Sequence, residues 1–246
     1  MSKRQVTYGK CFFCGEAFAK NAITRHLGKC PARQEAIVKE SGKPAQLFHL
    51  LVEGRYETGY WMHIEIPASR TLADLDNFLR AIWLECCGHL SAFTIGNTRF
   101  EMDTGMIDAM WKDFFGPSQP VKSMQTKLYS ALAVGDSFLH EYDFGTTTEL
   151  KLKVVGERKG VPPQKGARVL ARNYAPVYPC AECGKPAKLF YVYEYPFDSY
   201  CQEHAEEHAS WGEGFMPIVN SPRTGECGYS GPHDKTLAFE ETYTGN

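Results

Sequence analysis

The 246-residue sequence predicts an α+β fold in which a central domain, with a mixed or antiparallel sheet and one long helix, is flanked by two small zinc modules. Two groups of cysteine and histidine residues stand near the two ends of the chain, at the spacings of zinc ligands. Between them, β-branched and aromatic runs alternate between apolar and polar positions. One amphipathic segment interrupts these runs, so we expect an α+β domain rather than a doubly wound one.

The composition excludes several classes of protein. With 43% hydrophobic residues the chain can build a packed core, so disorder along its whole length is excluded. Nine cysteines are too few for a disulfide-stapled miniprotein, and an odd number cannot all pair. The polar start and the short longest apolar run, LFHLLV, predict neither a signal peptide nor a membrane span. We therefore expect a reduced, cytoplasmic protein whose cysteines serve metal binding, redox chemistry or packing.

The formal net charge of −2 is unevenly distributed along the chain. Residues 1–33 contain seven basic residues and one acidic residue, whereas residues 34–164 and 165–246 each carry a net charge of −4. A basic head on an acidic body favours contact between a polyanion and the head alone. A solvated finger surface explains the same charges equally well.

Residues 1–33 predict a C2HC zinc finger. Cys11 and Cys14 form a C-x2-C pair, and His26 and Cys30 follow at the spacing C-x2-C-x11-H-x3-C. This is close to the zinc-finger pattern of two ligands on a turn and two on a helix. Because His26 and Cys30 are four residues apart, one helical face would present both to one ion.

The other residues of this segment also fit a ββα finger, which it resembles. Phe18 and Ile23 occupy the positions where such fingers keep their small core. Gly15 can adopt the positive φ that turns backbone amides toward the thiolates. About thirty residues bury too little surface to fold alone, so we expect zinc to supply the folding energy. The alternative, a CxxC redox pair, lacks a surrounding βαβ pattern.

The candidate nucleic-acid contacts are the basic residues of this finger, Lys10, Lys20, Arg25 and Lys29. If the helix carries His26 at the usual place, its base-reading positions are Ala19, Ala22 and Arg25. Alanine offers no hydrogen bond, and one Arg–guanine contact discriminates by only about 1–3 kcal/mol. Such a finger would hold phosphate but specify little sequence. A protein-binding finger is equally permitted.

A second ligand group lies in residues 165–246. Cys180 and Cys183 are followed, after seventeen residues, by Cys201 and His204. Two independent pairs at ligand spacing are a strong zinc signature, and no open coordination position is evident, so we expect a structural ion. The aromatic stretch between the pairs predicts a strand or hairpin, and QEHAEEHA after it favours a helix. The arrangement resembles a treble-clef or zinc-ribbon module.

One histidine is an alternative ligand at the second group, and three cysteines remain outside both groups. His208, one turn after His204, is a rival fourth ligand, but we expect it to support the site or lie on the surface. Cys86 and Cys87 are expected mostly in the core, with a vicinal thiol sensor as the alternative. Cys227 is expected to be a small buried residue in a turn-rich tail. Two Zn2+ sites are therefore expected, with six cysteines as ligands and three as buried thiols.

A short helix or linker is expected before the central domain, which occupies residues 46–160 after a linker at 34–45. Thr71 can cap the long helix, with Asp74 in a box-like position. The apolar face of that helix, which ends near Gly88, comprises Leu72, Leu75, Leu79, Ile82 and Cys86. Strands are expected at 47–53, 60–66, 89–95, 98–102, 138–144, 147–155 and 168–172. The fifth and sixth of these strands predict a hairpin around Gly145.

Three segments follow one another in the central domain: TLADLDNFLRAIW, GHLSAF and LAVGDSFLHEYDFG. Their most specific parts are His89-Leu90 and the run from Tyr142 to Gly145. In this order they resemble the plasmid pRiA4b ORF-three-like family, also described as mobile-element passenger TnpR-like proteins, over roughly residues 46–158. The resemblance implies an α+β fold and an association with plasmids or transposons, but no known reaction.

The sequence departs from the pattern of that family at several polar positions. Thr146, Thr148 and Leu150 stand where the family commonly has Asp, Trp and His. Met62 and His63 follow Trp61 where the family has Trp-Arg-Arg. If those positions form an active site, this protein has lost much of it.

A candidate pocket for acid–base or metal chemistry comprises His63, His89, His140 and Asp143. Nothing in their spacing requires them to converge. The sequence contains no H-E-x-x-H, G-x-S-x-G, P-loop or G-x-G-x-x-G motif. We therefore expect Asp143 to be a turn residue, and His89 and His140 to be partly buried strand residues.

The leading hypothesis is a non-enzymatic zinc-binding adaptor associated with mobile elements. Its basic head would contact nucleic acid or a protein partner, and no membrane contact is expected. The first alternative is a purely structural or protein-interaction protein whose two zincs fold small modules. The second alternative is a hydrolase or nuclease that uses the candidate pocket.

Overall fold

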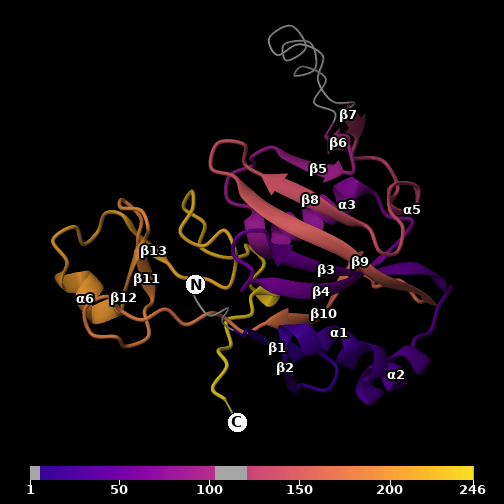
Figure 1. Cartoon of the computed structure of the whole chain (residues 1–246), viewed down its shortest axis with the longest axis horizontal. Helices are drawn as coiled ribbons and strands as arrows, with labels where there is room; N and C mark the ends of the chain where they lie inside the picture. The colour runs from indigo at the N-terminus through magenta and orange to yellow at the C-terminus, as the bar shows by residue number, and fades with distance from the viewer. Residues whose placement is uncertain (1–5, 103–120, 246) are drawn as a thin grey trace, which may run out of the picture. The chain divides into compact units, whose positions relative to one another are not determined.

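The computed structural model describes residues 6–102 and 121–245 (Figure 1). Lys3 and Arg4 of the basic head therefore lie outside the described residues. The chain divides into two compact units. The sheet unit comprises Met1–Phe78 and Leu90–Asn173, and the C-terminal unit comprises Leu79–His89 and Tyr174–Asn246.

The sheet unit contains a ten-stranded mixed sheet, in the order β2-β1-β10-β4-β3-β9-β8-β5-β6-β7. Its strands are β1 (Tyr8–Cys11), β2 (Ala17–Ala19), β3 (Ala45–Gly54), β4 (Trp61–Pro67), β5 (Ser91–Ile95), β6 (Thr98–Glu101), β7 (Val121–Ser123), β8 (Ser137–Tyr142), β9 (Thr148–Gly160) and β10 (Arg168–Asn173). Neighbouring strands pair antiparallel, except that β6 and β7 are parallel. The α+β class and the mixed sheet are thus confirmed.

The burial pattern of the strands follows their place in the sheet. Every residue of β4, WMHIEIP, is buried, because this strand lies between β10 and β3 and is covered on both faces. In β9, buried residues alternate with exposed ones from Leu150 to Val154, so Lys151 and Lys153 face solvent. The period of two is that of a strand with one face in the core.

The helices of the sheet unit are short. They are α1 (Lys20–Lys29), α2 (Pro31–Val38), α3 (Leu72–Leu79) and α5 (Leu128–Ala131). The capping box is confirmed: the Thr71 N–H donates to Asp74 Oδ2 over 2.8 Å, and the Asp74 N–H donates to Thr71 Oγ1 over 3.0 Å. No helix in the described residues is long and apolar enough to cross a bilayer.

The expectation of one long helix from residue 71 to Gly88 is wrong. After α3 the backbone widens into a π-helical turn, η1 (Arg80–Leu84), and then leaves the helix. The Glu85 N–H donates to the Arg80 carbonyl over 2.9 Å, and Arg80 Nε donates to the Glu85 carboxylate over 2.6 Å. These two bonds, both spanning five residues, stabilise the wide turn that ends the helix.

The hairpin formed by β8 and β9 has Asp143 at its turn. This residue has a left-handed φ of 65°, and its Oδ1 accepts hydrogen bonds from the backbone N–H groups of Gly145 and Thr146. Aspartate tolerates this conformation because its side chain replaces backbone hydrogen bonds in the turn. The predicted hairpin and the role of Asp143 as a turn residue are confirmed.

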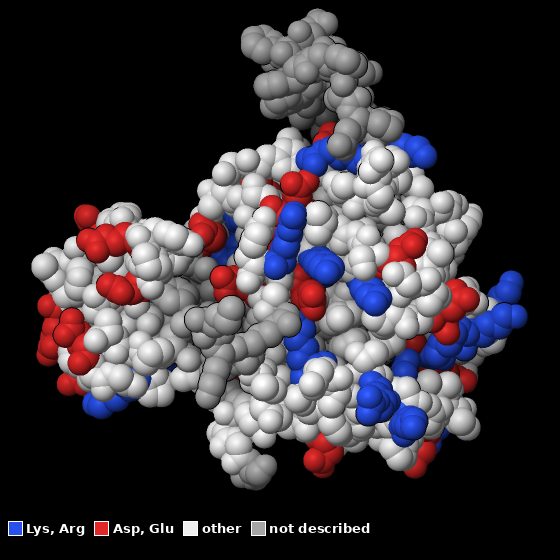
Figure 2. Space-filling model, in the orientation of Figure 1, with Lys and Arg blue, Asp and Glu red and all other residues white. Residues whose placement is uncertain are grey.

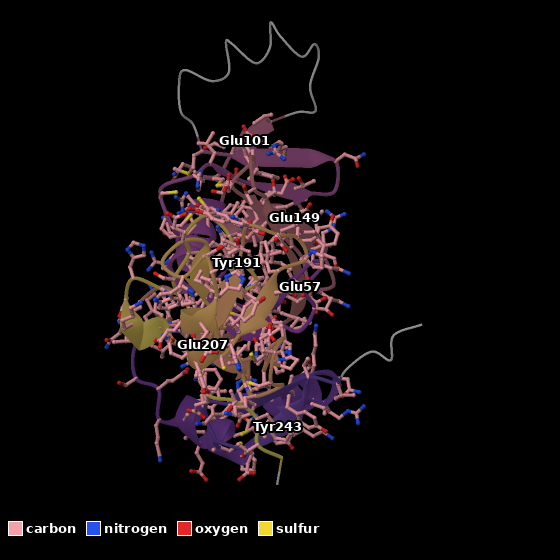
Figure 3. All side chains as sticks on the ribbon, turned by 90° about the vertical axis from the view of Figure 1, so that its left-hand side faces the viewer. Glu57, Glu101, Glu149, Tyr191, Glu207 and Tyr243 are labelled. Carbon is pink, nitrogen blue, oxygen red and sulfur yellow. The ribbon has the colours of Figure 1, made fainter. Side chains whose placement is uncertain are left out.

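The C-terminal unit contains a three-stranded sheet in the order β12-β11-β13. Its elements are η1, β11 (Leu189–Tyr191), β12 (Asp198–Tyr200), α6 (Gln202–Glu207), β13 (Phe215–Pro217) and the 3-10 turn η2 (Lys235–Leu237). Strands β11 and β12 form the antiparallel hairpin expected in the aromatic stretch. Tyr191 in β11 and Glu207 at the end of α6 are labelled in Figure 3.

Candidate metal centres

The four donors of the N-terminal segment converge and define site 1. The donor atoms of Cys11, Cys14, His26 and Cys30 all lie within 4.8 Å of one another. His26 Nε2 is 3.4 Å from Cys14 Sγ. Tetrahedral zinc, with Zn–S of about 2.3 Å and Zn–N of about 2.0 Å, separates sulfur from nitrogen by about 3.5 Å. Both the donor set and this distance fit Zn2+.

Local structure explains how the donors of site 1 meet. Cys11 ends β1, and the following turn closes with a 2.8 Å hydrogen bond from the Gly15 N–H to the Cys11 carbonyl. His26 lies on α1, but Cys30 is the residue after the helix rather than a member of the same helical face. An extended backbone at Cys30 turns the chain into α2, so its thiol still reaches the group.

Site 1 is built into the edge of the large sheet. Strand β1 pairs antiparallel with β10, with Cys11 opposite Ala171. The buried cluster around the site includes Ile23 and Leu27 of α1, and also Trp61 and Leu170 of the sheet. Hydrophobic burial against the sheet therefore stabilises the finger in addition to any metal.

The electrostatics of site 1 without a cation disfavour charge. Burial lowers the pKa of His26, which leaves the neutral imidazole that a metal requires. Burial also raises the pKa of Cys14 to about 11. A bound divalent cation would reverse the second effect, because a coordinating thiol is deprotonated.

The donors of Cys180, Cys183, Cys201 and His204 form site 2 and also lie within 4.8 Å of one another. His204 Nδ1 is 3.3 Å from Cys201 Sγ and 3.5 Å from Cys180 Sγ. Cys183 Sγ and Cys201 Sγ are 3.9 Å apart. Two thiolates on one tetrahedral zinc are separated by about 3.8 Å, so the spacing of these two sulfurs fits a single zinc ion.

Backbone hydrogen bonds favour the thiolate form of Cys180. Burial disfavours its thiolate, but backbone N–H groups of Cys201, Cys183 and Glu182 donate to it and lower its pKa to about 6. Its hydrogen bond with His204 raises the pKa of that imidazole. Because the thiolate is the metal-binding form, this pKa favours metal binding near neutral pH.

The rival ligand His208 lies among aromatic rings instead. Its ring centroid is 4.8 Å from that of Tyr191 and 5.3 Å from that of Phe215. Its Nδ1 accepts a hydrogen bond from the Ser210 N–H over 3.1 Å. His208 thus packs against the β11–β13 sheet, and the donor group contains His204.

A third donor group, site 3, consists of Cys86, Cys87, His89 and Cys227, again within 4.8 Å. The expectation that the three cysteines are buried thiols is wrong, because Cys87 and Cys227 are exposed and Cys86 is half-buried. The helical period placed Cys86 in the core, but η1 ends at Leu84 and the following residues leave the helix. The structure thus offers three candidate groups where two were expected.

One sequence signal is shared by all three sites. In each of them a cysteine is followed directly by glycine with positive φ: Gly15 (79°), Gly88 (78°), Gly184 (71°) and Gly228 (70°). A Cβ at any of these glycines would meet no atom within 4 Å, so the requirement is backbone conformation rather than space. All four Cys-Gly pairs of the sequence belong to donor groups. The pairs at Cys87 and Cys227 are the signal by which site 3 could have been found.

The histidines of the candidate pocket have different partners. His63 Nδ1 is 2.8 Å from His49 Nε2, and His63 Nε2 is 3.3 Å from the hydroxyl of Thr24. His140 Nε2 is 2.7 Å from Asp76 Oδ1. Both imidazoles have no exposed surface, so neither reaches a solvent-borne substrate in this structure.

The other two members of the candidate pocket also have roles of their own. Asp143 forms the β8–β9 turn described above. His89 precedes β5, which begins at Ser91, so the expectation of a strand residue is wrong. Its imidazole belongs to site 3 in the C-terminal unit.

The basic residues proposed for nucleic-acid contact differ in their surroundings. Arg25 and Lys29 are exposed on α1, and Lys10 is half-buried on β1. Lys20 Nζ is 3.0 Å from the Glu53 carboxylate and donates to the Thr58 carbonyl over 2.7 Å. Figure 2 shows Lys and Arg side chains over α1 and α2, with carboxylates among them.

Comparison with known structures gives a limited similarity. A solved protein of unknown function from Methanosarcina mazei Go1 is 20% identical to this chain, with a TM-score of 0.38. The similarity covers 49% of this chain and 64% of that chain. This chain therefore spans less than two thirds of that protein. No curated protein matches the sequence.

The family described as Plasmid pRiA4b ORF-3-like protein matches residues 52–220. The match continues beyond residue 158, where the resemblance between the sequences was expected to end. It includes all four donors of site 2 and three of site 3, whereas Cys227 and the whole of site 1 lie outside it. Because the match covers more than half of the sequence, this chain belongs to the plasmid pRiA4b ORF-3-like family.

Proposed function

We propose that the protein is a non-catalytic zinc-binding adaptor in which sites 1 and 2 hold structural Zn2+ ions. The observation that carries this proposal is the convergence of three cysteines and one histidine within 4.8 Å at each site. Four protein ligands complete a tetrahedron and leave no position for a reactive water, which is the pattern of structural zinc. The metal would therefore hold the turn and helix at each site together.

We further propose that the finger contacts the phosphate backbone of a nucleic acid. Helix α1 buries Ile23 and Leu27 against the sheet, so its opposite face is exposed with Ala22, Arg25 and Lys29. Arg and Lys on such a face can bind phosphate without reading the sequence. Lys20 is excluded from this role because Glu53 already pairs with it.

A second candidate is that site 1 serves only the fold, as a structural or protein-interaction element. The pairing of β1 with β10 favours it, because the finger is a fixed part of the sheet edge. The association with mobile elements is implied by the name of the family. Nucleic-acid binding therefore distinguishes the two candidates.

Metal analysis tests the first part of the proposal. Full-length protein is purified without a histidine tag, and zinc per chain is measured by mass spectrometry beside the variants Cys14→Ser and Cys183→Ser. We expect each variant to contain one zinc fewer than the wild type. Equal zinc in all three proteins would contradict structural zinc at sites 1 and 2.

Binding to a labelled 20-base-pair duplex, measured by fluorescence anisotropy across salt concentrations, tests the second part. We expect Arg25→Ala/Lys29→Ala to weaken binding and to reduce the log–log salt slope by about 0.9 for each phosphate that the variant no longer neutralises. The matched control is Lys151→Ala/Lys153→Ala on the exposed face of β9. Absence of binding at low salt, or an equal weakening in the control, would favour the purely structural candidate.

A further inference from the structure

We infer that Cys86, Cys87, His89 and Cys227 form a third zinc site, in which three thiolates and one imidazole bind one ion. Neither the family description nor the spacing of the sequence motifs assigns this site. Its ligands come from two segments, the loop after η1 and the tail around Cys227. His89 and Cys227 are 138 residues apart in the sequence.

The sulfur–sulfur distances within site 3 fit one ion rather than a disulfide. Cys87 Sγ is 3.6 Å from both Cys86 Sγ and Cys227 Sγ. A disulfide requires about 2.05 Å, whereas two thiolates on tetrahedral zinc are about 3.8 Å apart. His89 Nε2 lies 2.9 Å from Cys87 Sγ and 3.2 Å from Cys227 Sγ, so one ring nitrogen faces both sulfurs. Both distances are shorter than the about 3.5 Å between sulfur and nitrogen on tetrahedral zinc, so the imidazole would move outward when the ion binds.

Buried contacts bring the two segments together without the metal. The indole N–H of Trp83 donates to the Asn220 carbonyl over 3.1 Å, and the Ser221 hydroxyl donates to the Trp83 carbonyl over 2.6 Å. Arg223, fully buried, places Nη2 3.5 Å from Cys86 Sγ. These contacts close the long loop between Trp83 and Asn220 in the absence of metal. The ion therefore binds to donors that are already close together and does not have to close this loop itself.

The backbone at site 3 has the form found at sites 1 and 2. Gly88 and Gly228 follow Cys87 and Cys227 with left-handed φ, as Gly15 and Gly184 follow their cysteines. Cys227 itself has a φ of 46°, and among the described residues Asp143 is the other non-glycine with positive φ. A strained cysteine conformation that aims a thiol at three other donors indicates a functional requirement for that position.

Exposure distinguishes site 3 from the other sites. Sites 1 and 2 each contain two buried cysteines, whereas no donor of site 3 is buried. A chelator can therefore approach an ion at site 3 more readily. We expect site 3 to release its zinc first when a chelator is added in steps.

Zinc content of full-length variants tests the assignment. The proteins are wild type, Cys227→Ala, His89→Ala and the control His233→Ala, which changes an exposed histidine outside the donor group. We expect one zinc fewer in the first two variants and the wild-type content in the control. If sites 1 and 2 bind no zinc, the zinc content of all four proteins is lower by the same amount. The difference between the wild type and the two site 3 variants is then unchanged. Equal zinc in the wild type and in both site 3 variants would overturn the assignment.

Alkylation of the wild-type chain gives an independent test that does not depend on a folded variant. Cys87 and Cys227 are exposed, so iodoacetamide can reach both thiols if they are free, and the reaction is run at alkaline pH because the thiolate is the reactive form. In zinc-loaded protein we expect peptide mass spectrometry to find both protected, and chelator to make both reactive. Rapid modification of both before chelator is added would overturn the proposal.

Discussion

The imidazole of His26 stacks on the ring of Phe18, with centroids 3.7 Å apart and planes inclined by 23°. Phe18 also packs against the buried cluster around site 1. The stack orients the imidazole so that Nε2 faces Cys14. Phe18 therefore connects the buried cluster around site 1 to the position of the His26 donor atom.

We therefore expect Phe18→Ala to weaken zinc binding at site 1 by about tenfold, the effect of removing a group that orients a ligand. Competition against a chelating dye measures the affinity. The control is Phe12→Ala, because Phe12 is 42% exposed and its removal should change zinc binding much less. Equal affinities in the wild type and Phe18→Ala would show that the stack does not orient the ligand.

Metal removal should affect the two units unequally. The core around site 2 has only four buried residues, two of which are proposed ligands, whereas the finger also packs on Trp61 and Leu170. In excess chelator we expect fast hydrogen exchange in β11 and β12 and continued protection in β3, β4 and β9. Hydrogen-exchange mass spectrometry measures both. Unchanged protection of β11 would mean that site 2 does not depend on metal.

Removal of a buried charge should destabilise the sheet unit. Glu65 has no exposed surface, and its carboxylate accepts hydrogen bonds from Arg33 (3.2 Å), Arg158 (2.7 Å) and Arg168 (2.6 Å). We expect Glu65→Gln to cost about 3 kcal/mol in urea unfolding, because Arg33 would be left buried without its counter-charge. Glu53→Gln, which breaks the partly exposed pair with Lys20, should cost less than about 1 kcal/mol. Equal costs would contradict this prediction.

The Glu65 carboxylate also makes the free energy of unfolding depend on pH in the acid range. Burial opposes its ionisation, but hydrogen bonds from Arg158 and Arg168 outweigh burial and lower the pKa of Glu65. Its folded pKa is thus below the unfolded value of about 4.3. The stabilisation is fully present above that value and is lost as the pH falls below it. Wild type and Glu65→Gln should therefore converge in stability at low pH.

Acidification should also act through the pair of His49 and His63. Burial lowers the pKa of His49 to about 4, and that of His63 well below its usual value. Below about pH 6.5 these histidines are protonated in the unfolded chain but stay neutral in the folded chain. The free energy of unfolding therefore decreases as the pH is lowered. Each proton contributes up to about 1.4 kcal/mol per pH unit. His49→Gln should flatten this slope in urea titrations between pH 5 and 7.5, and the exposed control His233→Gln should keep it.

Several elements were predictable because their signals are local. The Thr71–Asp74 capping box, the β8–β9 hairpin and the aromatic β11–β12 hairpin each depend on residues close together in the sequence. The donor groups of sites 1 and 2 were predictable for the same reason, since each contains a pair of cysteines separated by two residues. The helix from Leu72 was placed correctly at its start, but its widening at Arg80 depends on a turn that periodicity does not encode.

The sequence by itself determined the α+β class, two donor groups and the family resemblance, because spacing and periodicity act over a few residues. Only the tertiary structure decided the pairing of β1 with β10, the separate partners of His63 and His140, and the meeting of Cys86, Cys87 and His89 with Cys227. These contacts join segments far apart in the chain, and their formation depends on which faces are buried together. Buried contacts of Trp83 with Asn220 and Ser221, rather than any local motif, place Cys227 beside the loop after η1.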